Sequence, residues 1–390
     1  MKKIKLLTLS FCLLLIGSVY VSADNNVNDD MSLIQIDIDK ATEHTNWSAV
    51  MDTTYFHPVV LETTDDCLIG EVLKIIYEDD MLIVADNMSH SVFFFNTEGK
   101  FLNSICKIGR GPDEYFELTD ISVKDGKVWL LDNISCKVLC YDYTGKMLHK
   151  FETQGGVSIQ ALENSILIGD VWGGVAAGGK YLLSEYNFEG NQVGKYIPYS
   201  AIDMFRDSGD WQPFFAFNNN SVDYLVSSKN IVYHYENGIV TQKYNIDFGR
   251  YNLPNRLAIR GNAAIIDRPE YNKCVLGVDK ISESSTYRFI EFRKGTSPYF
   301  CIVDKYTNSV ISLSTDKTNT VFQTPRGTKN IVYKDYLLSY HSGIELYQLR
   351  EYIWKVNPEN IKGKGIDLYN ISQGLSADDN GVVLMMKLKH

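Results

Sequence analysis

The residues able to carry acid–base or metal chemistry are present in this sequence, but none of them forms a recognised catalytic motif. Seven histidines are scattered along the chain, and no two stand at metal-ligand spacing. The serine-hydrolase elbow GxSxG, the zinc motif HExxH, the P-loop and the dinucleotide motif GxGxxG are all absent. A Ser-His-Asp triad can still assemble from distant segments, since triads are defined by geometry. The motifs favour a protein without catalysis, and we predict no metal and no cofactor.

Acidic side chains offer another route to catalysis, because glycosidases work with a pair of carboxylates. Asp86 and Asp132, however, each end an apolar run just before a turn. An aspartate at such a position accepts hydrogen bonds from the amides of its own turn. We therefore expect both residues to be structural.

Arg110 stands out in the string IGRGPDEY, where it lies between two glycines. The glycines leave the neighbouring backbone bare, so we expect the arginine side chain to be prominent. One hypothesis is that Arg110, Glu114 and Tyr115 bind an acidic or hydroxylated ligand. The alternative is that Arg110 pairs with a carboxylate of a neighbouring structural unit and acts as a brace. The sequence leaves both open.

Two tryptophans are further candidates for ligand binding. Trp172 lies in the glycine-rich run GDVWGG, and Trp211 stands close to Pro213. Exposed tryptophans in such loops can stack on sugar rings, whereas most other aromatic residues here fall on strand patterns and are expected to be core.

The sequence repeats at an interval of about 46 residues. Asp86 and Asp132 are 46 residues apart, as are Gly99 and Gly145. Within one unit, the hairpin signal DG and two further turns separate four short strands. Four antiparallel strands in a repeat of this length are the pattern of a β-propeller blade. The sequence predicts an all-β fold, a six-bladed β-propeller of four-stranded antiparallel blades.

The blades were placed from the spacing of the strand and turn signals. They span residues 65–108, 109–154, 155–200, 201–249, 281–325 and 326–390. An early strand at 33–38 is expected to close the ring by pairing with the C-terminal blade, and residues near 250–280 are expected to be an insertion. Asp120 would open an innermost strand and face the channel, so a functional role stays open beside a structural one.

The first 23 residues have the pattern of a secretory signal peptide, with early lysines, an apolar run and small residues before Asp24. We therefore expect export to the periplasm, the cell surface or the medium, with residues 24–390 forming a single domain. Cys12 raises a lipid-anchor alternative, but Phe11 occupies a position where a lipobox needs a small residue. The net charge of −10 argues against nucleic acid as a partner, and no further apolar run is long enough to span a membrane.

Several strings resemble those of a known family. IGRGPDEY, FFNTEGKF and DDNGVVLMMKL are similar to segments of secreted six-bladed β-propellers of the Bacteroidota, which are distantly similar to NHL-repeat and TolB-type propellers. The resemblance covers about residues 33–388. Relatives usually carry a lipobox and end in Asn-Pro, where this chain has Asn380-Gly381. The family is largely of unknown function, so the resemblance implies a fold and a secreted location but says little about chemistry.

The function that the sequence supports best is a non-catalytic binding or interaction module. Its ligand would be a glycan, a peptide or a partner protein, recognised by loops on a rigid ring. The alternative is a propeller hydrolase or lyase acting on carbohydrate or lactone. A cluster of carboxylates or histidines with shifted pKa values at the channel mouth would favour that alternative. The oligomeric state cannot be read from the sequence.

Overall fold

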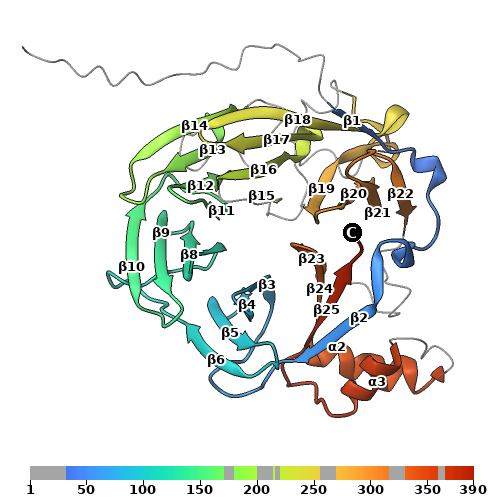
Figure 1. Ribbon diagram of the computed structural model, residues 1–390, viewed down its shortest axis with the longest axis horizontal. Coiled ribbons are helices and arrows are strands. Elements are labelled where there is room, and N and C mark those ends of the chain that lie inside the picture. Colours follow the sequence, from blue (N-terminus) through green and yellow to red (C-terminus); the bar gives the residue numbers. More distant parts are fainter. Residues whose placement is uncertain are drawn as a thin grey trace, which may run out of the picture. The chain divides into compact units, whose positions relative to one another are not determined.

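The backbone forms six β-sheets that stand around a common centre, as the computed structural model shows (Figure 1). The structure describes residues 32–170, 180–199, 214–215, 220–254, 269–315, 330–358 and 365–390, with only the backbone of Thr53, Asn330 and Ile331. The expected signal peptide and Cys12 lie outside these residues. The prediction of a six-bladed β-propeller with four-stranded antiparallel blades is confirmed.

Each blade takes its strands from one stretch of the chain, apart from two N-terminal strands. Blade 1 comprises β3 (Val72–Glu78), β4 (Met81–Asp86), β5 (Ser91–Asn96) and β6 (Phe101–Ile105). Blade 2 comprises β7 (Asp120–Lys124), β8 (Lys127–Asp132), β9 (Lys137–Asp142) and β10 (Met147–Glu152). Blade 3 comprises β11 (Ser158–Ala161), β12 (Ile166–Gly169), β13 (Tyr181–Tyr186) and β14 (Gln192–Pro198). In each of these blades the first strand lies innermost and the fourth outermost (Figure 1).

The other three blades follow the same plan. Blade 4 comprises β15 (Phe214–Phe215), β16 (Ser221–Val226), β17 (Ile231–Glu236) and β18 (Ile239–Asp247), with β1 (Ser32–Gln35) added outside. Blade 5 comprises β19 (Val275–Glu283), β20 (Tyr287–Lys294), β21 (Ser297–Asp304) and β22 (Val310–Ser314). Blade 6 comprises β23 (Asn330–Tyr333), β24 (Tyr336–His341), β25 (Val382–Leu388) and β2 (Met51–Val60). Thus β19 begins inside the range 250–280 that was expected to be an insertion.

An N-terminal strand closes the ring, but it is not the expected segment 33–38. The closing strand is β2, which pairs antiparallel with β25 as the outermost strand of blade 6. The residues at 33–38 instead form β1, which runs parallel to β18, and the short helix η1 (Ile38–Lys40). The physical reason is that Ile34 and Ile36 bury their side chains in the apolar cluster between blades 4 and 5.

The apolar core lies between neighbouring blades. Ile83 and Phe94 of blade 1, for example, pack in one cluster with Ile121 and Leu130 of blade 2. Similar clusters join the other neighbouring blades. Alternating strand residues therefore face opposite neighbours, and this packing accounts for the near-continuous burial of strands such as β4 and β8.

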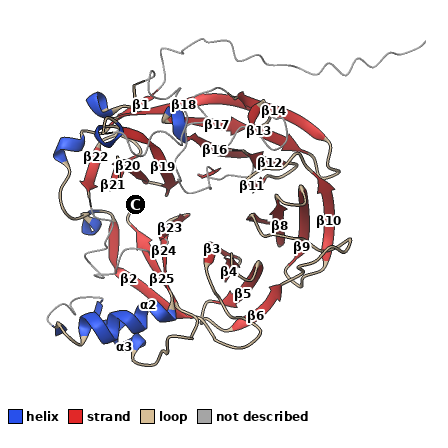
Figure 2. Cartoon of the chain, turned by 180° about the vertical axis from the view of Figure 1, so that it is seen from behind, coloured by secondary structure: helices blue, strands red, loops and turns tan. Residues whose placement is uncertain are grey.

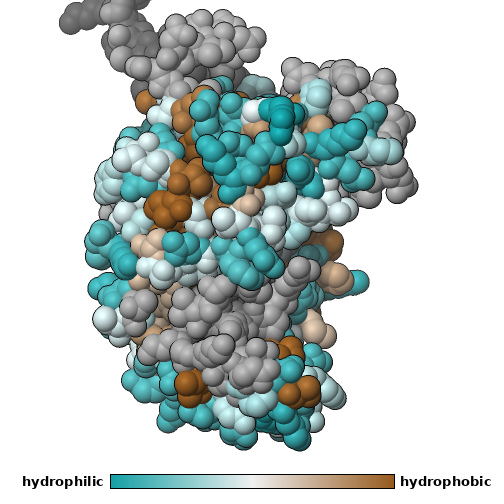
Figure 3. All heavy atoms as spheres, turned by 90° about the vertical axis from the view of Figure 1, so that its right-hand side faces the viewer, coloured by the Kyte–Doolittle hydropathy of each residue, from teal (hydrophilic) through white to brown (hydrophobic). Residues whose placement is uncertain are grey.

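A helical segment interrupts blade 6 between β24 and β25. It contains α2 (Gly343–Gln348), the π-helical turn η8 (Leu349–Trp354) and α3 (Gly365–Ser372), and it lies at the outer edge of the ring (Figure 2). Leu346, Trp354 and Leu368 anchor it to the blade core. No helix of the described residues is long and apolar enough to cross a membrane. On the side of the molecule beside these helices, apolar side chains are interspersed among polar ones (Figure 3).

The repeated aspartates are turn caps, as expected. Asp86 accepts hydrogen bonds from the amides of Gly70, Glu71 and Ser89, at 2.6–2.9 Å. Asp132 accepts equivalent bonds from Phe116 at 2.7 Å and from Ser135 at 3.0 Å. Both carboxylates are fully buried. Each one therefore ties the turn after the second strand of a blade to the connection that enters the same blade.

Candidate functional site

The three residues predicted around the glycine–proline turn differ in exposure: Arg110 is exposed, Glu114 is half-buried and Tyr115 is buried. Arg110 is exposed, its guanidinium lies 6.0 Å from the ring centroid of Phe116, and it makes no ion pair with any carboxylate that the structure describes. The brace hypothesis required such an ion pair. Ligand binding by Arg110 stays a prediction.

Glu114 and Tyr115 have structural positions. The Glu114 carboxylate accepts a 2.6 Å hydrogen bond from the Gly111 amide, and a Cβ at Gly109 would lie 2.0 Å from its Oε2. Tyr115 is fully buried and its hydroxyl donates to the carbonyl oxygen of His90 at 2.5 Å. Burial raises the pKa of Tyr115 far above its ordinary value. The other two candidates, Trp172 and Trp211, lie outside the described residues.

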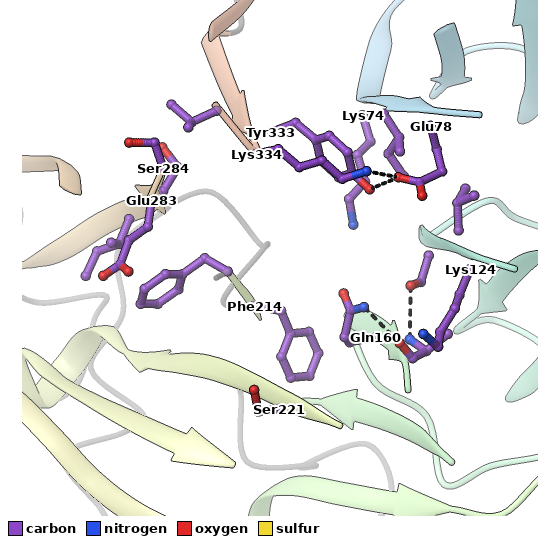
Figure 4. Close-up of a pocket in the computed structure, with 18 of the residues that line it drawn as sticks. Lys74, Glu78, Lys124, Gln160, Phe214, Ser221, Glu283, Ser284, Tyr333 and Lys334 are labelled. Atoms are coloured by element: carbon purple, nitrogen blue, oxygen red, sulfur yellow. Dashed lines mark hydrogen bonds and ion pairs between the residues drawn. The ribbon is translucent and has the colours of Figure 1, made fainter. Parts of the chain in front are cut away.

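The structure instead points to the centre of the ring, where a cavity of about 700 Å³ is lined by residues from all six blades. Lys74 and Glu78 reach it from β3, Phe214 from β15 and Glu283 from β19 (Figure 4). The labelled side chains surround one open central space in this view. None of the sequence-predicted candidates Arg110, Glu114 and Tyr115 is among the lining residues.

Lysines dominate the charged lining. Among the residues that the structure describes, six lysines and four carboxylates line the cavity, although the chain as a whole has a net charge of −10. The lysines come from five blades: Lys74 on β3, Lys124 on β7, Lys243 on β18, Lys280 on β19, Lys305 after β21 and Lys334 after β23. At the rim, Glu78 accepts hydrogen bonds from the Tyr333 hydroxyl at 2.6 Å and from Lys334 at 2.9 Å (Figure 4).

Asp120 lies behind this lining and joins three blades. Its Oδ1 accepts a 3.0 Å bond from Lys74 Nζ of blade 1, and its Oδ2 accepts a 2.9 Å bond from the Ile159 amide of blade 3. The side chain is buried, and burial raises the pKa of Asp120 although Lys74 opposes the shift. Both oxygens are thus occupied within the protein, which favours the structural role for Asp120.

A charged cluster forms the cavity wall where blades 4 and 5 meet. On blade 4, Asp223 Oδ2 lies 2.5 Å from Lys243 Nζ, and Asp223 Oδ1 lies 2.7 Å from His234 Nδ1. On blade 5, Glu283 Oε1 accepts a 2.7 Å bond from Arg288 Nε and Glu283 Oε2 lies 2.8 Å from Lys305 Nζ. The two carboxylates are completely or almost completely buried, whereas His234, Lys243 and Lys305 are partly exposed.

The environments of these two carboxylates move their pKa values apart. Burial raises the pKa of Asp223, with Lys243 opposing the shift and the negative charge of Glu283 adding to it. Burial would also raise the pKa of Glu283, but Arg288, Lys305 and Lys243 outweigh it and hold the pKa below its ordinary value. Lys243 therefore acts on both carboxylates, so the two halves of the wall form one electrostatic unit.

Sequence reasoning missed this cavity because its residues come from six distant stretches of the chain. One signal was nevertheless present in the repeat. Lys74 and Asp120 occupy equivalent positions of successive units, and so do Glu78 and Lys124, each pair 46 residues apart. Charges of opposite sign at one repeat position, on strands predicted to be innermost, indicate polar contacts across the channel wall. No group of acidic, histidine and cysteine residues suited to a metal ion occurs among the residues described.

Comparisons with known proteins agree with the fold. A putative exported protein from Bacteroides fragilis superposes with a TM-score of 0.75 at 16% sequence identity, covering 92% of this chain and 100% of that chain. A member of the DUF4221 family from Bacteroides vulgatus gives a TM-score of 0.50 at 11% identity, covering 87% and 97% of the two chains. At these identities the similarity concerns the fold alone.

The sequence match identifies a family, but the description of that family names no activity. No curated protein matches the chain. Residues 33–387 match the family model described as "Domain of unknown function (DUF4934)", and the chain belongs to that family.

Proposed function

We propose that this protein is an exported binding module that holds a carboxylate-bearing oligosaccharide in its central cavity. The observation that carries the proposal is the convergence of six lysines on one cavity in an otherwise acidic chain. Export is supported by the signal-peptide pattern of residues 1–23 and by the description of the Bacteroides fragilis protein as exported. The source of both structural relatives supports an origin in the Bacteroidota. Kinship with NHL and TolB-type propellers remains part of the proposal.

The distribution of charge across the wall favours an anionic ligand. Asp120 and Asp223 lie behind the lining and Glu283 lines the cavity with only 1% of its side chain exposed, and each of the three is paired with a lysine. The groups that a ligand meets first are the lysines in front of them. Lys124 and Lys334 both line the cavity, and the Lys334 side chain is 62% exposed. Because the described lining carries more lysines than carboxylates, the cavity should favour ligands of negative charge.

The uncharged lining favours a sugar over other anions. Five serines and Gln160 line the cavity and can hydrogen-bond to hydroxyl groups. Phe214, Phe215 and Tyr333 contribute ring surface of the kind that packs against sugar rings. The volume of about 700 Å³ falls within the range of roughly 300–1,000 Å³ typical of small-ligand sites. An acidic peptide has the same charge but fewer hydroxyl groups.

Calorimetric titration tests this function directly. The probes are an oligogalacturonate, a neutral oligosaccharide of similar length and an oligoglutamate peptide. We expect the oligogalacturonate to bind and the neutral sugar not to bind. Preference for the oligoglutamate would assign the cavity to a peptide ligand instead. The absence of binding for all three probes would contradict the proposal.

A further inference from the structure

The Asp223–His234 pair has the geometry of an oriented acid–base group. We propose that His234 transfers a proton in a β-elimination that cleaves a uronate-containing oligosaccharide bound in the cavity. This inference rests on the proposed ligand class and adds a reaction to it. The groups that would carry out this lyase reaction are a histidine, the carboxylate that orients it and the surrounding lysines.

Asp223 fixes the orientation of the histidine ring. Its Oδ1 lies 2.7 Å from His234 Nδ1, while Lys243 holds the other carboxylate oxygen at 2.5 Å. A carboxylate that accepts a hydrogen bond from Nδ1–H leaves the lone pair of a neutral imidazole on Nε2. The Asp223 side chain is fully buried, whereas the His234 side chain is 30% exposed and lines the cavity. The imidazole is therefore the member of this pair that a ligand can reach.

The same burial argues against a glycosidase with two catalytic carboxylates. Such an enzyme needs both carboxyl groups beside the scissile bond. Asp223 and Glu283 have side-chain exposures of 0% and 1%, and each is already paired with a lysine. Asp223 is therefore closed to a substrate in the cavity, and Glu283, although it lines the cavity, exposes only 1% of its side chain. The wall between blades 4 and 5 thus presents an imidazole and ammonium groups rather than a pair of acids.

The lysines supply what an elimination next to a carboxylate requires. A proton on the carbon beside a carboxylate is weakly acidic, and pairing that carboxylate with a cation makes its removal easier. Lys243 and Lys305 are both partly exposed at this wall, and Lys280 lines the same cavity. The only carboxylate within 4.0 Å of His234 Nε2 among the described residues is Glu236, which is 62% exposed. A bound uronate would therefore face mainly positive groups.

The reaction balances without an oxidant or a metal ion. His234 Nε2 takes the proton from the carbon α to the uronate carboxylate. The electron pair of that C–H bond forms a C=C bond to the β carbon, and the bond from the β carbon to the glycosidic oxygen breaks. The leaving oxygen takes a proton from water, and the imidazolium returns its proton to the solvent. The products are an unsaturated uronate and a shortened sugar chain.

The test incubates the full chain with oligogalacturonate and with oligoglucuronate. It follows the ultraviolet absorbance of the conjugated double bond and the mass of the products. We expect the unsaturated product from at least one substrate. His234→Gln should slow its formation by about 100-fold or more, in line with the usual contribution of a general base, while changing the affinity by less than about threefold. Lys355→Gln, a change of an exposed lysine, serves as the matched surface control.

The outcomes separate this inference from the proposed function. Binding without any unsaturated product overturns the reaction and leaves the binding module intact. A wild-type rate in His234→Gln also overturns it, because another group must then take the proton. Absence of binding overturns both proposals. Deuterium exchange at the α carbon of a bound uronate in D₂O gives a second readout of proton abstraction, which a merely structural histidine would not affect.

Discussion

Lys74 and Asp120 occupy the same position in successive repeats, and their side chains meet with Nζ 3.0 Å from Oδ1. A 46-residue shift along the sequence thus becomes an ion pair between adjacent blades. Lys74 also donates to the carbonyl oxygen of Ile121 at 2.8 Å. The contact that joins the two blades also places the Lys74 ammonium group on the cavity wall. The ion pair therefore contributes both to the packing of the blades and to the positive charge of the site.

Removing one member of this pair should be costly. Lys74→Met leaves the buried Asp120 carboxylate without its cation, which typically costs about 3–5 kcal/mol in unfolding free energy. The double variant Lys74→Met/Asp120→Asn should recover a large part of that loss, because the buried charge is gone. Urea unfolding measures both. Lys40→Met is the surface control, since the Lys40 side chain is 81% exposed. Equal stability of the single and double variants would contradict this account.

Asn380, just before β25, connects the closing blade to the segment that follows β2. Its Oδ1 accepts a 2.8 Å bond from the Ile69 amide, and its Nδ2 donates to the carbonyl oxygens of Glu62 and Cys67. The residue is buried. Asn380→Ala leaves these buried groups unpaired, so we expect a loss of roughly 2–4 kcal/mol in denaturant unfolding. Asn191→Ala, in an exposed turn, should change stability by less than about 0.5 kcal/mol.

Gly109 and Glu114 should be energetically coupled. An alanine at 109 would place its Cβ 2.0 Å from Glu114 Oε2, so the flexible carboxylate must leave the Gly111 amide. Gly109→Ala should cost about 1–2 kcal/mol in the wild-type background, the usual consequence of losing such a bond. In a Glu114→Ala background the same change should cost distinctly less. A double-mutant cycle measures this coupling, and additive effects would show that the carboxylate does not restrict position 109.

His341 should make the fold sensitive to acid. The side chain is fully buried on β24, and burial lowers its pKa from 6.5 to about 3. The unfolded chain therefore binds this proton more readily than the folded one between those pH values. Stability should then fall as pH decreases below 6.5, by about 1.4 kcal/mol per pH unit for one proton.

The variant His341→Gln isolates this contribution. Its unfolding free energy should depend less steeply on pH between pH 4 and pH 6, by about one proton. An unchanged slope in His341→Gln would show that position 341 is not the source of the acid sensitivity.

Local signals predicted the blades well where turn chemistry is explicit. Asp125 and Gly126 adopt positive φ angles of 49° and 71° in the hairpin between β7 and β8, as the DG signal indicates. The strand β2 was missed because Pro58 is a poor residue for a paired strand. It is tolerated here because β2 is an outermost strand, where one row of backbone groups needs no partner.

The helical segment of blade 6 was also missed, although its start is encoded locally. Ser342 and Glu345 form a reciprocal capping box at the beginning of α2. The candidate site was harder to predict, because the contact between Asp223 and His234 depends on the register of β16 and β17, and that between Glu283 and Lys305 on how β19 and β21 lie in blade 5. The cavity itself arises only once the six blades stand around one centre. A repeat pattern gives the order of the blades but not the side chains that converge at their centre.

The titration of oligogalacturonate into wild type and a rim variant tests the central claim most directly. The rim variant, Lys124→Gln/Lys334→Gln, removes two lysines of the cavity lining, and Lys355→Gln removes an exposed lysine that is not among the lining residues. We predict about a tenfold or greater loss of affinity for the rim variant, a wild-type affinity for Lys355→Gln, and weaker binding at high salt for the wild type. Equal affinities of all three proteins would contradict the proposed ligand site in the central cavity.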